Sequence, residues 1–183
     1  MPYGPGVSGI RAVSSTPSAP ESSPPAALAA GPRCLVLTGT ARSGKARWLV
    51  DEIRRVQAER PGTRCAVLSA ELSPADLKQI AQALPEVALH RLFLPCLCCP
   101  GAANLPGEAV KLIESARADW LVVELPVVAA TGLLAELTAA LHWPREFVVC
   151  LDPAWAAARA ADTLPPFHAL LLQSADRVVS VPR

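Results

Sequence analysis

The sequence predicts an α/β fold in which a mostly parallel sheet is flanked by helices. Short, continuously apolar segments alternate with segments of helical periodicity, a pattern typical of parallel strands that are buried on both faces. The chain has 183 residues, of which 51% are hydrophobic and 18% charged, so one domain with a sizeable core is expected. Residues 1–32, rich in Pro, Ser, Gly and Ala, predict a disordered tail ahead of a folded domain over 33–183.

Each element follows from local periodicity and from the residues that interrupt it. Apolar runs predict strands over 34–38, 65–68, 87–94, 120–125, 147–151 and 177–181. Helical spacing predicts helices over 46–59, 74–84, 108–117, 129–141, 154–162 and 167–174, with a loop over 95–107. Ser73 is expected to cap the second helix, and Asp152, which precedes Pro153, the fifth.

Composition excludes several classes of function. The formal net charge is +1, which argues against nucleic-acid binding by bulk charge. No apolar run reaches the roughly 18 residues needed to cross a bilayer, so no membrane partner is expected. The first thirty residues contain no apolar leader, which predicts a reducing, cytoplasmic location. No Gly-x-Ser-x-Gly elbow supports serine hydrolase chemistry.

A glycine-rich segment between the first strand and the first helix predicts a phosphate-binding loop. Backbone N–H groups of such a turn form a concave nest, and the helix that follows adds the positive end of its dipole. Lys45 supplies a charge for the outer phosphates of a nucleotide. The expected nucleotide-binding residues are Gly39, Thr40, Ala41, Arg42, Ser43, Gly44, Lys45 and Ala46.

One position argues against efficient hydrolysis. The motif requires Ser or Thr after its lysine, because that hydroxyl coordinates Mg²⁺, and Ala46 has no ligand atom. Mg²⁺ is therefore a doubtful cofactor. Glu124 lies at the end of a buried strand beside the expected phosphates, where an acid can also be held by hydrogen bonds from the backbone.

Six cysteines divide into two groups. Cys34, Cys65 and Cys150 lie in separate apolar runs and are interpreted as small buried hydrophobes. The other three, Cys96, Cys98 and Cys99, lie within four residues and predict a thiolate site for a soft metal such as Zn²⁺. A tetrahedral site needs a fourth ligand. The candidates are Glu71, His90, Cys65, water or a second copy of the chain, as in a homodimer; a Cys96–Cys99 redox pair is the alternative.

Five segments, in order, make the chain resemble the CobW/HypB/UreG family of P-loop metal-trafficking GTPases, and the Cys-x-Cys-Cys triplet is similar to that of its CobW-like branch. These segments are residues 35–45, 67–71, 119–124, 147–152 and 173–179. The resemblance implies a P-loop NTPase-like fold, GTP as cofactor, zinc or cobalt as cargo and a metalloprotein client. It also implies that Glu124 helps to handle Mg²⁺ and its water, which makes it a candidate catalytic residue alongside Lys45. Glu71 is interpreted either as a ligand of the metal or of Mg²⁺ or as a solvated loop charge.

The sequence departs from the family pattern at several positions. Ala46 replaces the Mg²⁺ ligand, Ala70 stands where the family has Asn, and Glu124 is followed by Leu-Pro-Val rather than a small polar pair and Gly. The sequence ends before the expected Asn-Lys-x-Asp motif and C-terminal domain. We therefore expect a divergent nucleotide-binding metallochaperone with weak or absent GTP hydrolysis. A catalytically inactive P-loop interaction module and a thiol redox protein are the alternatives.

Overall fold

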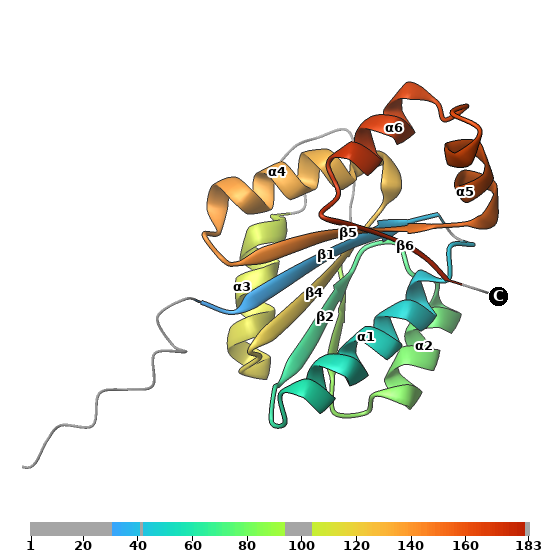
Figure 1. The fold of residues 1–183 in the computed structure, drawn as a ribbon. Coiled ribbons are helices and arrows are strands. Elements are labelled where there is room, and N and C mark those ends of the chain that lie inside the picture. Colours follow the sequence, from blue (N-terminus) through green and yellow to red (C-terminus); the bar gives the residue numbers. More distant parts are fainter. Residues whose placement is uncertain (1–30, 41, 94–103, 182–183) are drawn as a thin grey trace, which may run out of the picture.

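A computed structural model describes residues 31–40, 42–93 and 104–181, and within them six parallel strands form one sheet. The strands lie in the order β3-β2-β4-β1-β5-β6, so β1 is central (Figure 1). The predicted α/β fold is confirmed. The strand bounds are β1 Arg33–Gly39, β2 Cys65–Ser69, β3 Ala88–Arg91, β4 Trp120–Leu125, β5 Arg145–Leu151 and β6 Arg177–Ser180.

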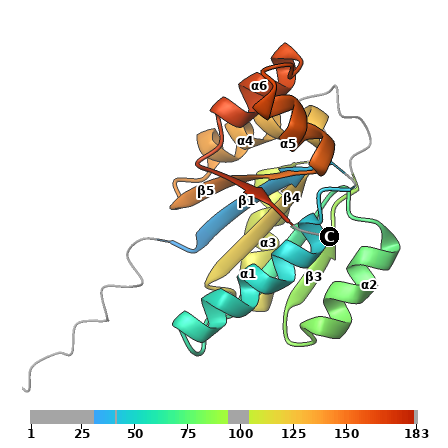
Figure 2. The same ribbon diagram turned by 45° about the vertical axis from the view of Figure 1, so that its right-hand side comes forward.

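Helices cover both faces of the sheet. In Figures 1 and 2, α1 and α2 lie on one face, and α3, α4, α5 and α6 lie toward the other. Within the described ranges, no helix is both long and apolar enough to cross a bilayer. The bounds are α1 Lys45–Glu59, α2 Pro74–Ala83, α3 Leu105–Ala116, α4 Ala130–Ala140 after a 3-10 turn at Val127–Ala129, α5 Pro153–Ala160 and α6 Pro166–Gln173.

Two apolar layers hold the helices to the sheet. On one face, Leu49 and Ile53 of α1 and Ile80 of α2 pack against β1, β2 and β4. On the other face, Leu105 of α3 and Leu171 of α6 pack against the same sheet. All five side chains are almost fully buried, so burial of apolar area fixes both layers.

Polar side chains set where the helices begin. Ser73 and Asp76 form a capping box at the start of α2, and Asp152 accepts a hydrogen bond from Trp155 N (2.9 Å) at the start of α5. Both predicted caps are confirmed. The predicted loop over 95–107 was too long, because α3 begins at Leu105 and takes in Pro106 and Gly107. A proline is tolerated in the first helical turn, where its missing N–H has no partner to lose.

The three isolated cysteines are buried, as predicted. Burial raises the pKa of Cys34 and of Cys150 to about 12, and that of Cys65 to about 11. Such thiols stay protonated near neutral pH and have little nucleophilic character. The two histidines near the C-terminal helices, His142 and His168, differ in their surroundings. His168 is half-buried and packs against Trp155, with ring centroids 4.1 Å apart and ring planes tilted by 39°, whereas His142 is exposed after the end of α4.

Candidate nucleotide site

The carboxyl edge of the sheet brings the central loops together. Strand β1 leads into α1 on one face, whereas its neighbours β4 and β5 lead into helices on the other face. Such a divergence of connections opens a crevice where α/β proteins commonly bind ligands. The Thr40 hydroxyl after β1 donates to a carboxylate oxygen of Asp152 after β5, which joins the two loops at this point.

Two glycines shape the turn between β1 and α1. Gly39 has φ 154° and Gly44 has φ 73°, backbone conformations that favour glycine. Ser43 turns back, with its N–H and hydroxyl both donating to the Thr40 carbonyl at 3.1 and 2.7 Å. In the described ranges, no side-chain hydrogen bond caps the start of α1 at Gly44, so the N–H groups of its first turn can donate to an anion.

The side chain of Lys45 is folded back into this turn. Its exposed fraction is 5%, and its Nζ donates to the Gly39 carbonyl at 3.0 Å. The same Nζ lies 2.7 Å from Glu124 Oε1 and 2.8 Å from Glu71 Oε2. The loop lysine is therefore held by two carboxylates.

Glu124 is fully buried and is held from both sides. While Oε1 faces Lys45, Oε2 accepts from Ser69 Oγ at 2.8 Å and from Glu71 N at 2.9 Å. It also accepts from Leu72 N at 3.2 Å. Oε2 thus has the hydrogen bonds of an acid held by the backbone, while the catalytic role of Glu124 stays a prediction.

The site formed by Lys45, Glu71 and Glu124 has a negative formal net charge. Burial lowers the pKa of Lys45, but Glu124 and then Glu71 more than offset that effect, so the pKa is raised above its ordinary value. The ammonium is charged at neutral pH, and the formal charges of Lys45, Glu71 and Glu124 sum to one negative charge. Glu71 differs from Glu124 in being 45% exposed, so its carboxylate can turn into water.

The residues present do not fit the Mg²⁺ site of a hydrolysing P-loop protein. Ala46 offers no oxygen and packs against the core beneath the loop. The nearby carboxylates of Glu71 and Glu124 are engaged by Lys45, and Thr40 donates to Asp152. Val181, just after β6, packs close to Gly44 at the start of α1. A Cβ added to Gly44 would lie 3.0 Å from the Cβ of Val181.

Comparisons with known proteins place the fold. The chain is similar to the signal recognition particle receptor FtsY from Elizabethkingia anophelis, with a TM-score of 0.55 and 15% identity over 81% of this chain and 48% of that one. A second structure of that protein, in complex with GDP, gives the same TM-score and identity over 80% of this chain. The structure of APE1195 is more distant, with a TM-score of 0.42 and 13% identity over 82% of this chain and 86% of that one.

The chain has an α/β fold like that of P-loop NTPases. It spans about half the length of the FtsY chain, 48%. No protein-family profile matches the sequence, and no curated protein matches it. The resemblance to the CobW/HypB/UreG family therefore stays a prediction.

Some predicted site residues fall outside the described part of the chain, namely Ala41, Cys96, Cys98 and Cys99. Within the described part, no three His, Cys, Asp or Glu side chains gather as metal ligands. Three of the suggested fourth ligands lie in the described part. Glu71 pairs with Lys45, and Cys65 lies at the amino end of β2, away from the loops at the carboxyl edge. His90, on β3, lies 3.7 Å from Glu108 Oε2.

Sequence reasoning missed the part played by Ser69. This residue ends β2, and its hydroxyl both donates to Glu124 and accepts from Leu72 N at 3.2 Å. The pairing of Ser69 with Glu124 across β2 and β4 explains the contact. A polar residue at the end of an apolar strand was the available signal.

Proposed function

We propose that the chain is a CobW-like P-loop protein that binds GTP on residues 39–46 and handles a thiophilic metal such as zinc, with weak or absent hydrolysis. The observation that carries the nucleotide part is the placement of Lys45. It lies at the start of α1, after a turn with two positive-φ glycines, and its Nζ is 2.7 Å from Glu124 Oε1. The GDP found with the similar protein FtsY is consistent with this proposal.

Nucleotide binding at this loop requires Lys45 to change partners. A phosphate group would compete with Glu71 for the ammonium, because both are anionic and Glu71 is the exposed member of the pair. Glu124 keeps its backbone donors and stays in place. Glu71 thus acts as an internal competitor of the phosphates.

Replacing this competitor should strengthen nucleotide binding. In the variant Glu71→Gln, one negative charge is removed 2.8 Å from Lys45 Nζ. We expect the dissociation constant of GTP to fall about tenfold, which corresponds to about 1.4 kcal/mol. Isothermal titration calorimetry at low salt measures this change.

The matched control is Glu114→Gln, which neutralises an exposed acid on α3. GTP affinity should change less than twofold in that variant. Equal or weaker GTP binding in Glu71→Gln than in the unchanged protein would contradict the competition.

The metal part rests on the three clustered thiols, Cys96, Cys98 and Cys99. The unchanged protein should bind one equivalent of zinc, and Cys98→Ser should lose this binding at least tenfold because thiolate ligands are lost. Zinc titration against a chromophoric chelator provides the measurement. The control Cys34→Ala removes a buried thiol on β1 and should leave zinc binding unchanged. Loss in both variants, or no zinc binding at all, would reject the metal role.

A second candidate function is an inactive P-loop scaffold that interacts with other proteins. Two observations favour it, the missing hydroxyl at Ala46 and the neutralisation of Lys45 by two carboxylates. It predicts that neither GTP nor ATP binds, even after Glu71→Gln. Measurable GTP binding by that variant, abolished when Lys45 is also replaced, would reject this candidate.

A further inference from the structure

A pocket of about 910 Å³ lies at the edge of the sheet opposite the phosphate loop. It is formed at the amino ends of β1 and β4, where α1 and α3 end. Pockets of this size commonly hold small ligands. Its charged lining is dominated by Arg33, Arg55, Arg60, Arg64 and Arg117.

Among the described residues, three of these five arginines have no acidic partner. The two acids of the lining are taken, because Glu59 pairs with Arg55 at 2.6 Å and Asp119 pairs with Arg64 at 3.3 Å. In the part of the chain that the structure describes, Arg33, Arg60 and Arg117 form no ion pair. Since the whole chain carries only +1, the pocket is a local concentration of positive charge.

Helix dipoles account for only part of this concentration. Arg60 and Arg117 are the C-cap residues of α1 and α3, where cations offset the negative helix ends. Each such end carries about half a negative charge, so two of them offset about one of the three unpaired cations. Arg33 opens β1 and has no such role. A positive excess remains that faces the pocket.

The pocket also has an apolar wall. Val56 of α1, Ile113 of α3 and Trp120 of β4 all contribute to its lining. Planar guanidinium groups bind phosphate and carboxylate through paired hydrogen bonds, whereas carbon atoms prefer an apolar contact. The combination suits a compact molecule with several anionic groups on a carbon skeleton.

We propose that this pocket binds a small organic polyanion, with Arg33, Arg60 and Arg117 as the residues that recognise its phosphate or carboxylate groups. The phosphate loop is a different site at the other edge of the sheet, where Lys45, Glu71 and Glu124 together carry a negative charge. For an anion without a nucleotide base, the electrostatic potential is therefore more favourable in the arginine pocket than beside Lys45.

The test uses the full chain with pyrophosphate and citrate as probes, each titrated by calorimetry in low-salt buffer without divalent cations. We expect saturable binding of at least one probe with a dissociation constant below about 1 mM, which corresponds to about −4.1 kcal/mol. The variant Arg60→Gln/Arg117→Gln should weaken it at least tenfold. The matched control Lys78→Gln/Arg159→Gln removes the same charge from α2 and α5 and should change binding less than twofold.

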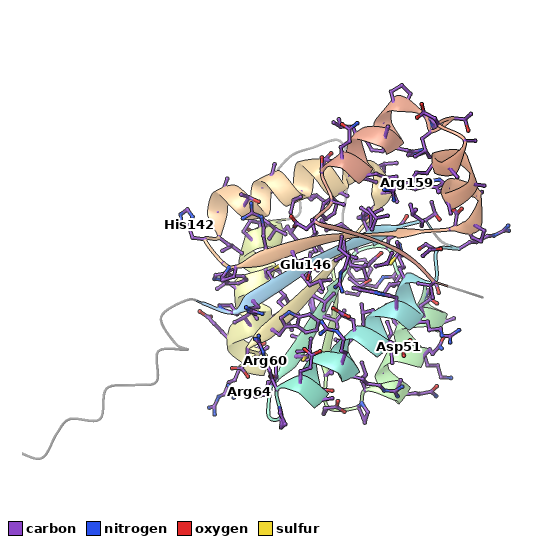
Figure 3. The ribbon with its side chains drawn as sticks, viewed as in Figure 1. Asp51, Arg60, Arg64, His142, Glu146 and Arg159 are labelled. Carbon is purple, nitrogen blue, oxygen red and sulfur yellow. The ribbon has the colours of Figure 1, made fainter. Side chains whose placement is uncertain are left out.

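Figure 3 shows Arg60 and Arg64 together at one end of the molecule and Arg159 at the other, which makes the control informative. The probe that binds reports whether the site prefers phosphate or carboxylate. Three outcomes would overturn the proposal. The first is no saturable binding of either probe, and the second is equal weakening by both double variants. The third is pyrophosphate binding that becomes tighter in Glu71→Gln and is unchanged in Arg60→Gln/Arg117→Gln. The last outcome would assign the anion to the phosphate loop instead. Circular dichroism and thermal unfolding of each variant establish that it is folded.

Discussion

Replacing Lys45 by methionine should lower the free energy of unfolding by about 3–5 kcal/mol, the range found when one partner of a buried ion pair is removed. The reason is the position of Glu124, which is fully buried. Methionine fills much of the lysine's volume but leaves Glu124 Oε1, now 2.7 Å from Nζ, without a cation. Urea unfolding followed by circular dichroism measures the change.

The double variant Lys45→Met/Glu124→Gln separates charge from packing. Glutamine keeps an oxygen that can accept from Glu71 N and Leu72 N, but it brings no buried charge. We expect the double variant to be more stable than Lys45→Met alone. A double variant that is less stable than either single one would mean that the ion pair is not the main source of the loss.

The pH dependence of this loss has a definite sign. Burial alone would lower the pKa of Lys45, but the carboxylates of Glu124 and Glu71 outweigh that effect. The pKa of Lys45 is therefore raised in the folded protein. Its contribution to stability is therefore fully present below the unfolded pKa of about 10.4 and is lost as pH rises through the folded value. The difference in unfolding free energy between the unchanged protein and Lys45→Met should be constant from pH 7 to 10 and shrink above that range.

The fold could be predicted because each buried strand is a short apolar run that can be recognised from its own residues. The run from Trp120 to Leu125 is apolar except for Glu124, and β4 has the predicted bounds, 120–125. Boundaries were harder where the sequence signal is mixed. Strand β3 was predicted over 87–94 but covers only Ala88–Arg91, because it is an edge strand that pairs with β2 alone. The predicted tail over 1–32 and the domain over 33–183 stay predictions.

The residues of the candidate site could be predicted from the sequence, but the contacts between their side chains could not. Motif spacing predicted Gly39, Lys45 and Glu124, yet nothing local indicates that Glu71 lies 2.8 Å from the lysine. That contact depends on β2 and β4 being adjacent, which is a property of the sheet order. The arginine pocket was missed for the same reason, since Arg33, Arg60 and Arg117 come from three separate chain segments that only the fold brings together.

The loop itself should be intolerant of a single added methyl group at Gly39. An alanine Cβ there would lie 2.5 Å from the Cys150 carbonyl oxygen, 2.8 Å from Ser43 Oγ and 2.9 Å from Cys150 Cβ. The nearest of these atoms is backbone of a central strand and cannot turn away. Overpacking and an unfavourable φ each cost about 1–3 kcal/mol, so we expect Gly39→Ala to lower the free energy of unfolding by about 4 kcal/mol.

Gly62→Ala is the matched control for this substitution. Gly62 also has a positive φ, 88°, but an added Cβ there would meet nothing within 4 Å. Its cost should be that of the backbone alone, about 1–2 kcal/mol. Since both variants add the same methyl group at a positive φ, the difference between them isolates the contact of β1 with β5 beneath the loop. Similar losses in the two variants, measured by urea unfolding, would mean that this contact does not fix the shape of the loop. A much larger loss for Gly39→Ala, together with loss of GTP binding, would tie the shape of the phosphate loop to the strand that carries Cys150.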